Sequence, residues 1–265
     1  MIEFQLPKTF AKNQFTFNPD ATPFKHFIPE NLGHDKFGNR MFASPNFSYL
    51  DRENQPTKAG ILISRLGDEF IKANPKILID LDRAFEKLEN TELPSEARKK
   101  GVGVGSKGTL KLLTVGGQSN VYLLEIGSQK YISKTKRPSS KKEEFLSNVN
   151  QPYINEMLQT QNLEFDLREE LKQFNINLPD YLFASGQVSL VKFEEGKECY
   201  LPSIYDVIRG LEQVVRNYIL KQRKSNNKLW NGIVVDSRFD NFLEKGDGKI
   251  IWIDPFRYYP SIKKI

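Results

Sequence analysis

Three polar residues near the carboxyl end of the sequence have the types and spacing of a phosphate and metal site. Asp236 ends the apolar run IVV, and Asn241 follows five residues later. Asp254 ends the apolar run IIWI, thirteen residues after Asn241. Mg²⁺ prefers hard oxygen ligands such as a carboxylate and an amide oxygen. The spacing therefore predicts that Asn241 and Asp254 hold metal-bound phosphates, and that Asp236 accepts the proton of an attacking hydroxyl.

A glycine-rich turn upstream has the composition of a phosphate-binding loop. The sequence GGQSN separates two short apolar runs. Glycine lets backbone N–H groups approach a phosphate because it has no side chain in the way. The candidate nucleotide-binding residues of this turn are Gly116, Gly117, Gln118, Ser119 and Asn120. The hydroxyl of Ser119 can also donate to a phosphate oxygen.

Two charged residues that follow this turn could complete a nucleoside triphosphate site. Lys134 stands in the strand-like run KYISKT and could place its ammonium group on the α and β phosphates. Glu156, in the next predicted helix, could orient that lysine. The alternatives for this orienting role are Glu143, Glu144 and Glu169. The order of these parts predicts a site for ATP and Mg²⁺.

Hydrophobic periodicity predicts the elements that must position these residues. Runs rich in Val, Leu, Ile, Tyr and Thr predict strands on both sides of the glycine turn and at Lys134. Pro152 can begin the helix that carries Glu156, because its missing N–H is not needed in the first turn. Asp166 is a candidate cap for the next helix. The best predicted helix covers residues 204–222, where apolar residues recur every three or four positions.

The first hundred residues have a different character. Residues 1–55 are rich in Phe, Pro and Asn and predict an extended arm. A helix with Leu62, Leu66 and Phe70 on one face should follow, and then a second helix. Residues 91–108 predict a linker. Its glycines spell G-x-G-x-x-G, but no predicted strand precedes them, so they do not indicate a dinucleotide site.

Together these motifs resemble the protein-kinase-like fold, on its aminoglycoside phosphotransferase and small-molecule kinase side. GGQSNVYLL resembles the phosphate loop of that group, KYISKTKRP resembles its lysine strand, and DSRFDNFL matches its D-x-x-x-x-N catalytic loop. IDPF matches the metal-binding aspartate, and IDPFRYY resembles the fructosamine-kinase type of ending. The small size is similar to that of minimal Bud32-type kinases. The resemblance covers about residues 108–258 and implies ATP and Mg²⁺ as cofactors.

The resemblance implies an α+β protein with a bilobal protein-kinase-like fold, in which an antiparallel N-lobe sheet faces a reduced helical C-lobe. We expect an N-terminal extension at 1–107, partly helical and packed on the core, and a minimal kinase-like domain at 108–265. Its lobes should cover 108–195 and 196–265. Only eleven residues follow the metal-binding aspartate, so we expect the N-terminal extension to complete the C-terminal lobe or to cover the cleft.

Composition and charge restrict the other classes of function. The net charge of +6 favours an anionic partner such as a nucleotide. Both histidines lie near the N-terminus, so no Ser-His-Asp triad and no zinc cluster is indicated. A single cysteine, the lack of a signal-peptide pattern and the lack of a long apolar run favour a cytoplasmic protein without a membrane partner.

The sequence therefore predicts a phosphotransferase that uses ATP and Mg²⁺ and acts on a hydroxyl of a small molecule or a protein. Three alternatives stay open at this point. The same fold could bind nucleotide without turnover, as a pseudokinase. It could transfer a nucleotidyl group with ATP reversed. The basic charge could instead mark a nucleic-acid-binding protein, which is possible but not favoured.

Overall fold

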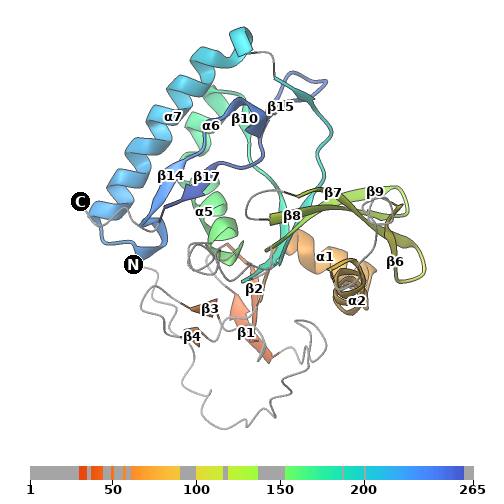
Figure 1. Ribbon diagram of the computed structural model, residues 1–265. Coiled ribbons are helices and arrows are strands. Elements are labelled where there is room, and N and C mark those ends of the chain that lie inside the picture. Colours follow the sequence, from red (N-terminus) through yellow and green to blue (C-terminus); the bar gives the residue numbers. More distant parts are fainter. Residues whose placement is uncertain are drawn as a thin grey trace, which may run out of the picture.

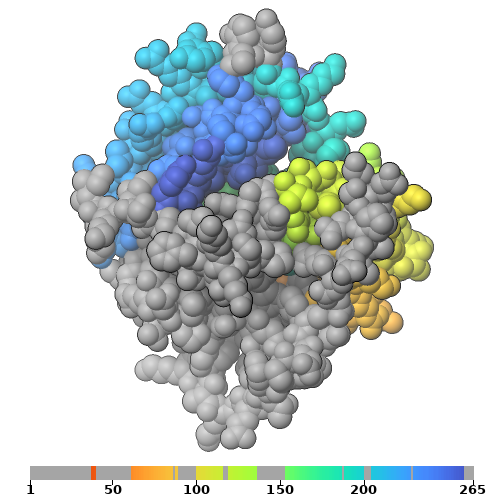
Figure 2. Space-filling view, viewed as in Figure 1, coloured from red at the N-terminus to blue at the C-terminus, as the bar shows by residue number. Residues whose placement is uncertain are grey.

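The computed structural model describes two lobes (Figure 1). The described residues are 30–34, 37–43, 49–50, 56–57, 61–89, 100–115, 119–136, 153–186, 188–199 and 201–259. One lobe is a large sheet with helices on both faces, and the other is built around one long helix. In the space-filling view, the blue surface of the second lobe borders the yellow-green surface of the sheet lobe (Figure 2).

The sheet lobe contains a nine-stranded sheet in which all neighbouring strands are antiparallel. In spatial order the strands are β1 (Glu30–His34), β2 (Arg40–Ala43), β5 (Ile61–Ile63), β11 (Tyr181–Ser185), β12 (Val188–Lys192), β9 (Gln129–Lys136), β8 (Ser119–Ile126), β7 (Gly108–Val115) and β6 (Val102–Val104). A separate two-stranded pair joins β3 (Tyr49–Leu50) and β4 (Pro56–Thr57). The predicted strands around the glycine turn are thus confirmed.

Helices cover both faces of this sheet because its strands alternate their apolar side chains. On one face lie α1 (Arg65–Ala73) and α2 (Ile77–Glu89), and on the other lies α5 (Tyr153–Asp166). In β5, Ile61 and Ile63 pack with α1 and α2, whereas Leu62 packs with the residues of α5. The helix α5 therefore lies between the sheet and the second lobe.

The second lobe packs short strands and helices around two buried tryptophans, Trp230 and Trp252. Its helices are α6 (Arg168–Gln173), α7 (Leu201–Lys224), η2 (Lys228–Trp230) and η3 (Phe239–Asn241). One sheet has the order β10 (Ile176–Asn177), β16 (Ile250–Trp252), β15 (Phe242–Glu244) and β13 (Lys197–Glu198), and β14 (Ile233–Val235) pairs with β17 (Phe256–Tyr258). The predicted long helix is confirmed as α7.

The α+β class and the two lobes agree with the prediction from the sequence. The expected boundary at residue 107 stays a prediction. Strands β5 and β6, which precede that boundary, belong to the same sheet as β7, so the described part of residues 61–107 joins the sheet lobe. Among the helices of the described ranges, none is both long and apolar enough to cross a membrane.

The prediction for the first helix is wrong at its N-terminus. Leu62 lies in a strand, and the helix begins at Arg65 because Ser64 caps it. The Ser64 hydroxyl accepts a hydrogen bond from the Gly67 N–H at 3.0 Å. Leu66 therefore lies outside the apolar face and is 45% exposed.

Two further local predictions are wrong. The stretch predicted as a linker contains β6, which forms a hairpin with β7. Gly105 has a φ of +59° in that hairpin turn, a conformation that favours glycine. Asp166 does not cap the following helix. It ends α5, and its carboxylate accepts a hydrogen bond from the Tyr218 hydroxyl at 2.6 Å.

Burial in the sheet lobe makes a direct stability prediction. Leu124 on β8 is fully buried in the cluster beneath α1 and α2, whereas Leu113 on β7 is 51% exposed. We expect Leu124→Ala to lower the free energy of unfolding by about 3 kcal/mol, because it removes buried methyl groups and leaves a cavity. Leu113→Ala should cost less than about 0.5 kcal/mol. Urea denaturation measures both values, and equal losses would contradict this packing.

Candidate phosphate and metal site

Backbone hydrogen bonds join the two segments that carry the Asp–Asn–Asp set. The Asp236 N–H donates to the carbonyl of Pro255 at 2.9 Å, and the Ile253 N–H donates to the carbonyl of Asn241 at 2.8 Å. The Trp252 indole N–H donates to the Asp236 carbonyl at 3.0 Å. The Asn241 amide approaches the same carbonyl at 3.4 Å. The loop after β14 and the loop after β16 therefore form one unit that holds the three predicted residues together.

Lys134 links the sheet lobe to this unit. On β9, the flanking residues Ser133 and Thr135 are buried on one face, so alternation places Lys134 on the opposite face, toward α5. Its ammonium nitrogen lies 3.6 Å from a carboxylate oxygen of Glu156 and 3.6 Å from a carboxylate oxygen of Asp254. The lysine thus contacts the predicted orienting glutamate and the predicted metal-binding aspartate at once.

Burial and neighbouring charges shift the pKa values of Lys134 and Asp254. Burial lowers the pKa of Lys134, but the neighbouring carboxylates of Asp254 and Glu156 outweigh it and raise the pKa above its ordinary value. Burial raises the pKa of Asp254 to about 6; the charges of Glu156 and Asp236 act in the same direction, and Lys134 opposes them. Lys134, Glu156 and Asp254 taken together therefore carry two negative charges and one positive charge when ionised, and a bound cation would relieve this excess.

The residues present fit a magnesium ion held mainly by a bound nucleotide. Asp254 offers a carboxylate and Asn241 an amide oxygen, and both belong to the joined loops. Within the described residues, no group of three or more His, Cys, Asp or Glu side chains is placed to hold a metal. Mg²⁺ commonly takes only one or two protein ligands and completes its shell with phosphate oxygens and water.

Two tyrosines form hydrogen bonds with residues of this site, and the sequence analysis did not predict them. The Tyr181 hydroxyl donates to the carboxylate of Glu156 at 2.5 Å, and the same carboxylate contacts Lys134. The hydroxyls of Tyr153 and Ser119 lie 2.6 Å apart, which ties the first turn of α5 to the start of β8. Both tyrosines are buried. Nothing in their spacing predicts these contacts, because each pairs with a residue far along the chain.

The other predicted residues have different outcomes. Ser119 and Asn120 begin β8, directly after the glycine turn. Gly116, Gly117 and Gln118 lie outside the described residues.

The alternatives for the orienting glutamate also differ. Glu169 does not take that role, since it lies on α6 and pairs with Lys172 at 2.9 Å. Glu143 and Glu144 lie outside the described residues.

Two arginines that the sequence reasoning missed hold the predicted base. Arg238 contacts Asp236 through Nε at 3.0 Å and through Nη2 at 3.0 Å. Arg257 contacts the same carboxylate through Nε at 2.5 Å. Its position follows from strand register, because Arg257 pairs with Val234 in the β14–β17 ladder, two residues before Asp236. The sequence gives no signal for this pairing.

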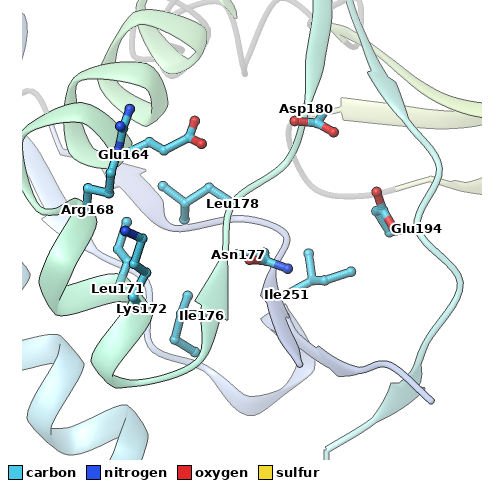
Figure 3. Close-up of a pocket in the computed structure, with 10 residues that line it drawn as sticks. All are labelled: Glu164, Arg168, Leu171, Lys172, Ile176, Asn177, Leu178, Asp180, Glu194 and Ile251. Atoms are coloured by element: carbon cyan, nitrogen blue, oxygen red, sulfur yellow. The ribbon is translucent and has the colours of Figure 1, made fainter. Parts of the chain in front are cut away.

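A cavity of about 540 Å³ is lined by residues that include parts of α5, α6 and β10 (Figure 3). Its lining residues are Glu164, Arg168, Leu171, Lys172, Ile176, Asn177, Leu178, Asp180, Glu194 and Ile251. None of the predicted site residues belongs to this set. The chemistry predicted from the sequence is therefore separate from this cavity.

The strand order, the Lys134–Glu156 ion pair and the joined aspartate loops define a protein-kinase-like fold. In chain order, the glycine-rich sequence separates the antiparallel strands β7 and β8, Lys134 is on β9 and Glu156 is on α5. A long helix, the Asp236 loop and the Asp254 loop follow. This is the order that the resemblance in the sequence implies.

No family model and no curated protein matches the chain. Among solved structures it is similar to the complex of Rv3197 with erythromycin from Mycobacterium tuberculosis, with 12% identity over 73% of this chain and 60% of that one, and a TM-score of 0.33. It is also similar to the streptomycin–ATP–APH(2″)-IIa ternary complex, with 13% identity over 64% of this chain and 75% of that one, and a TM-score of 0.28.

A third similar structure is the complex of Rio2 kinase from Chaetomium thermophilum with ADP/Mg²⁺ and phosphoaspartate. The identity is 17% over 63% of this chain and 53% of that one, and the TM-score is 0.28. The chain thus spans only about half to three quarters of the length of these proteins. The protein-kinase-like fold is identified from the strand order and the contacts described above.

The raised pKa of Asp254 predicts a pH-dependent stability. An unfolded chain ionises this carboxyl near its ordinary pKa of 3.8, whereas the folded protein ionises it at about 6. Between these values only the folded protein holds the proton, so this group lowers stability as the pH rises. Asp254→Asn should therefore be more stable than the wild type at pH 7, and the difference should shrink as the pH falls toward about 4.5.

Urea denaturation across this pH range checks the prediction. Asp206→Asn is the matched control, since that aspartate is exposed on α7. A stability difference between Asp254→Asn and the wild type that does not change with pH would show that Asp254 does not have a raised pKa.

Proposed function

We propose that the chain is a phosphotransferase that uses ATP and Mg²⁺ to phosphorylate a hydroxyl of a small molecule or a protein. The observation that carries the proposal is the position of Lys134. Its ammonium group contacts Glu156 from α5 and Asp254 from the second lobe, each at 3.6 Å. A lysine held between an orienting carboxylate and a metal-binding carboxylate can position the phosphates of a nucleotide.

Each predicted residue has a distinct role in this proposal. Lys134 provides positive charge for the α and β phosphates, and Glu156, fixed by Tyr181, keeps its ammonium group in place. Asp254 and Asn241 would hold Mg²⁺, which neutralises charge on the phosphates as they react. The backbone of the glycine turn, with Ser119 and Asn120, would bind phosphate oxygens.

Asp236 is the proposed base. It lies at the end of β14, in the loop that is joined to the Asp254 loop. The acceptor oxygen forms a bond to the γ-phosphorus, the bond from that phosphorus to the bridging oxygen breaks to leave ADP, and the hydroxyl proton passes to Asp236. A positioned base of this kind contributes about 10²- to 10⁴-fold to the rate.

One observation favours a second candidate, a nucleotide-binding module without turnover. Both carboxylate oxygens of Asp236 already accept hydrogen bonds from arginines. In this arrangement the base is not available to a hydroxyl. Nucleotide binding without any turnover would establish this alternative.

The proposed partners are a nucleotide and an acceptor, and the proposed location is the cytoplasm. The free cysteine Cys199 is buried, and a reducing compartment would suit it. No contact among the described residues favours nucleic acid over nucleotide.

Nucleotide binding tests the role of Lys134. We expect Lys134→Met to weaken the affinity for Mg²⁺–ATP at least about tenfold, because the phosphates lose a charged partner. Lys111→Met is the matched control. Lys111 lies in the same sheet and also pairs with a glutamate, Glu125, at 2.6 Å. Titration calorimetry measures both, and an equal affinity in the two variants would contradict the proposed site.

Turnover tests the role of Asp236. The rate of ADP release is measured in the presence of pooled hydroxyl acceptors. We expect this rate to be at least about 10²-fold lower in Asp236→Asn than in the wild type, while the affinity for ATP stays the same. Asp240→Asn, an exposed neighbour that pairs only with Arg238 among the described residues, should stay near the wild-type rate. A wild-type rate in Asp236→Asn would exclude it as the base.

A further inference from the structure

The carboxylate of Asp236 has almost no capacity to accept another hydrogen bond. Arg238 forms a two-pronged contact, from Nε to Oδ1 and from Nη2 to Oδ2, both at 3.0 Å. Arg257 donates through Nε to Oδ2 at 2.5 Å, and the Arg238 backbone N–H approaches Oδ1 at 3.4 Å. The Asp236 side chain itself is only 3% exposed. The two guanidinium groups therefore form the surface that an incoming molecule meets at the base.

This surface presents two cationic guanidinium groups. One aspartate faces two arginines, and the arginine side chains are 52% and 37% exposed, so their heads reach solvent. Each guanidinium has five N–H donors, of which Asp236 uses only a part. The remaining contacts are weak or neutral: Arg238 Nη1 lies 3.5 Å from the exposed Asp240, and Arg257 also bonds to Tyr259. The planar guanidinium groups of Arg238 and Arg257 therefore have N–H donors available for an oxyanion.

The position of the two guanidinium groups restricts which molecules can serve as the phosphate acceptor. A hydroxyl can lose its proton to Asp236 only if it lies within hydrogen-bond distance of that carboxylate. The rest of the acceptor must then lie beside Arg238 and Arg257. A cationic group has no hydrogen-bond acceptor to offer these guanidinium donors, and a neutral acceptor molecule would leave the arginines bound to the base.

We infer that the acceptor carries an oxyanionic group, a phosphate or a carboxylate, next to the hydroxyl that is phosphorylated. This inference rests on the proposed function and names its substrate class. Arg238 and Arg257 bind the oxyanion, and in doing so they turn donors away from Asp236. The carboxylate then becomes free to accept the hydroxyl proton. The two arginines are therefore specificity-determining residues that couple recognition of the acceptor to release of the base.

Inorganic phosphate is a direct probe for this subsite. Titration calorimetry of the full chain is carried out with saturating Mg²⁺ and either ADP or a non-hydrolysable ATP analogue. The ATP analogue fills the position of the transferred phosphoryl group, whereas ADP leaves that position open. We expect phosphate to bind the wild type in both arms, because the subsite for the acceptor is separate from the γ-phosphate position.

Two substitutions test the assignment. Arg238→Gln and Arg257→Gln should each weaken phosphate binding about tenfold in the arm with the ATP analogue. Arg83→Gln is the matched control and should leave it unchanged, since Arg83 is an exposed arginine beside Asp80 on α2 of the sheet lobe. If a glutamine variant does not fold, as judged by its thermal midpoint, Arg257→Lys keeps the charge without the fork and should bind phosphate with intermediate affinity.

Several results would overturn the inference. Phosphate that binds only with ADP would show that the arginines hold the transferred phosphoryl group instead of the acceptor. No phosphate binding with the ATP analogue, or equal affinity in Arg257→Gln and Arg83→Gln, would exclude the subsite. Failure of the proposed function is distinct, because nucleotide would then either not bind with Mg²⁺ or bind without any turnover of the pooled hydroxyl acceptors. Phosphate titration of the nucleotide-free variants would still show whether Arg257 binds an oxyanion.

Discussion

The rest of the structure depends on the ion pairs of Lys134. The lysine is held on β9 of the sheet lobe, yet its two partners come from α5 and from the loop after β16. A buried cation without partners would be costly, so the lobes are arranged to supply two carboxylates. Tyr181 fixes one of them, and backbone hydrogen bonds hold the loop that carries the other. One lysine thus connects the sheet, the helix between the lobes and the aspartate loops through two ion pairs.

The same site balances stability against function. Burial raises the pKa of Asp254, which means that the folded protein holds this carboxylate in its ionised form at a cost in stability. A hydrophobic or neutral residue would avoid that cost. The retained charge is what a magnesium–phosphate group would need. The negative charge of Asp236 is compensated differently, because two arginines, Arg238 and Arg257, form ion pairs with its carboxylate.

The sequence predicted the motifs better than it predicted the contacts. Order and spacing were enough to single out Lys134, Glu156 and Asp254, because they lie in a predicted strand, in the next predicted helix and at the end of an apolar run, in that order. Leu62 was misassigned because a short apolar run fits either a buried strand or the start of a helix, and the Ser64 cap decides between them. Arg257 could not be predicted as a partner of Asp236, because their contact depends on the register of β14 and β17. Gly116 and its two neighbours in the turn lie outside the described residues, so their role stays a prediction.

The most direct test of the central claim is the thermal midpoint of the full chain with ATP, measured with and without Mg²⁺, for the wild type and Asp254→Ala. A ligand that binds only the folded state stabilises it by about 2.7 kcal/mol at one hundred times its dissociation constant. If Lys134 and Asp254 form a magnesium–nucleotide site, ATP should raise the thermal midpoint of the wild type only when Mg²⁺ is present. ATP should not raise the midpoint of Asp254→Ala. An equal rise in both proteins, or no rise in the wild type, would contradict the assignment of this group as a magnesium–nucleotide site.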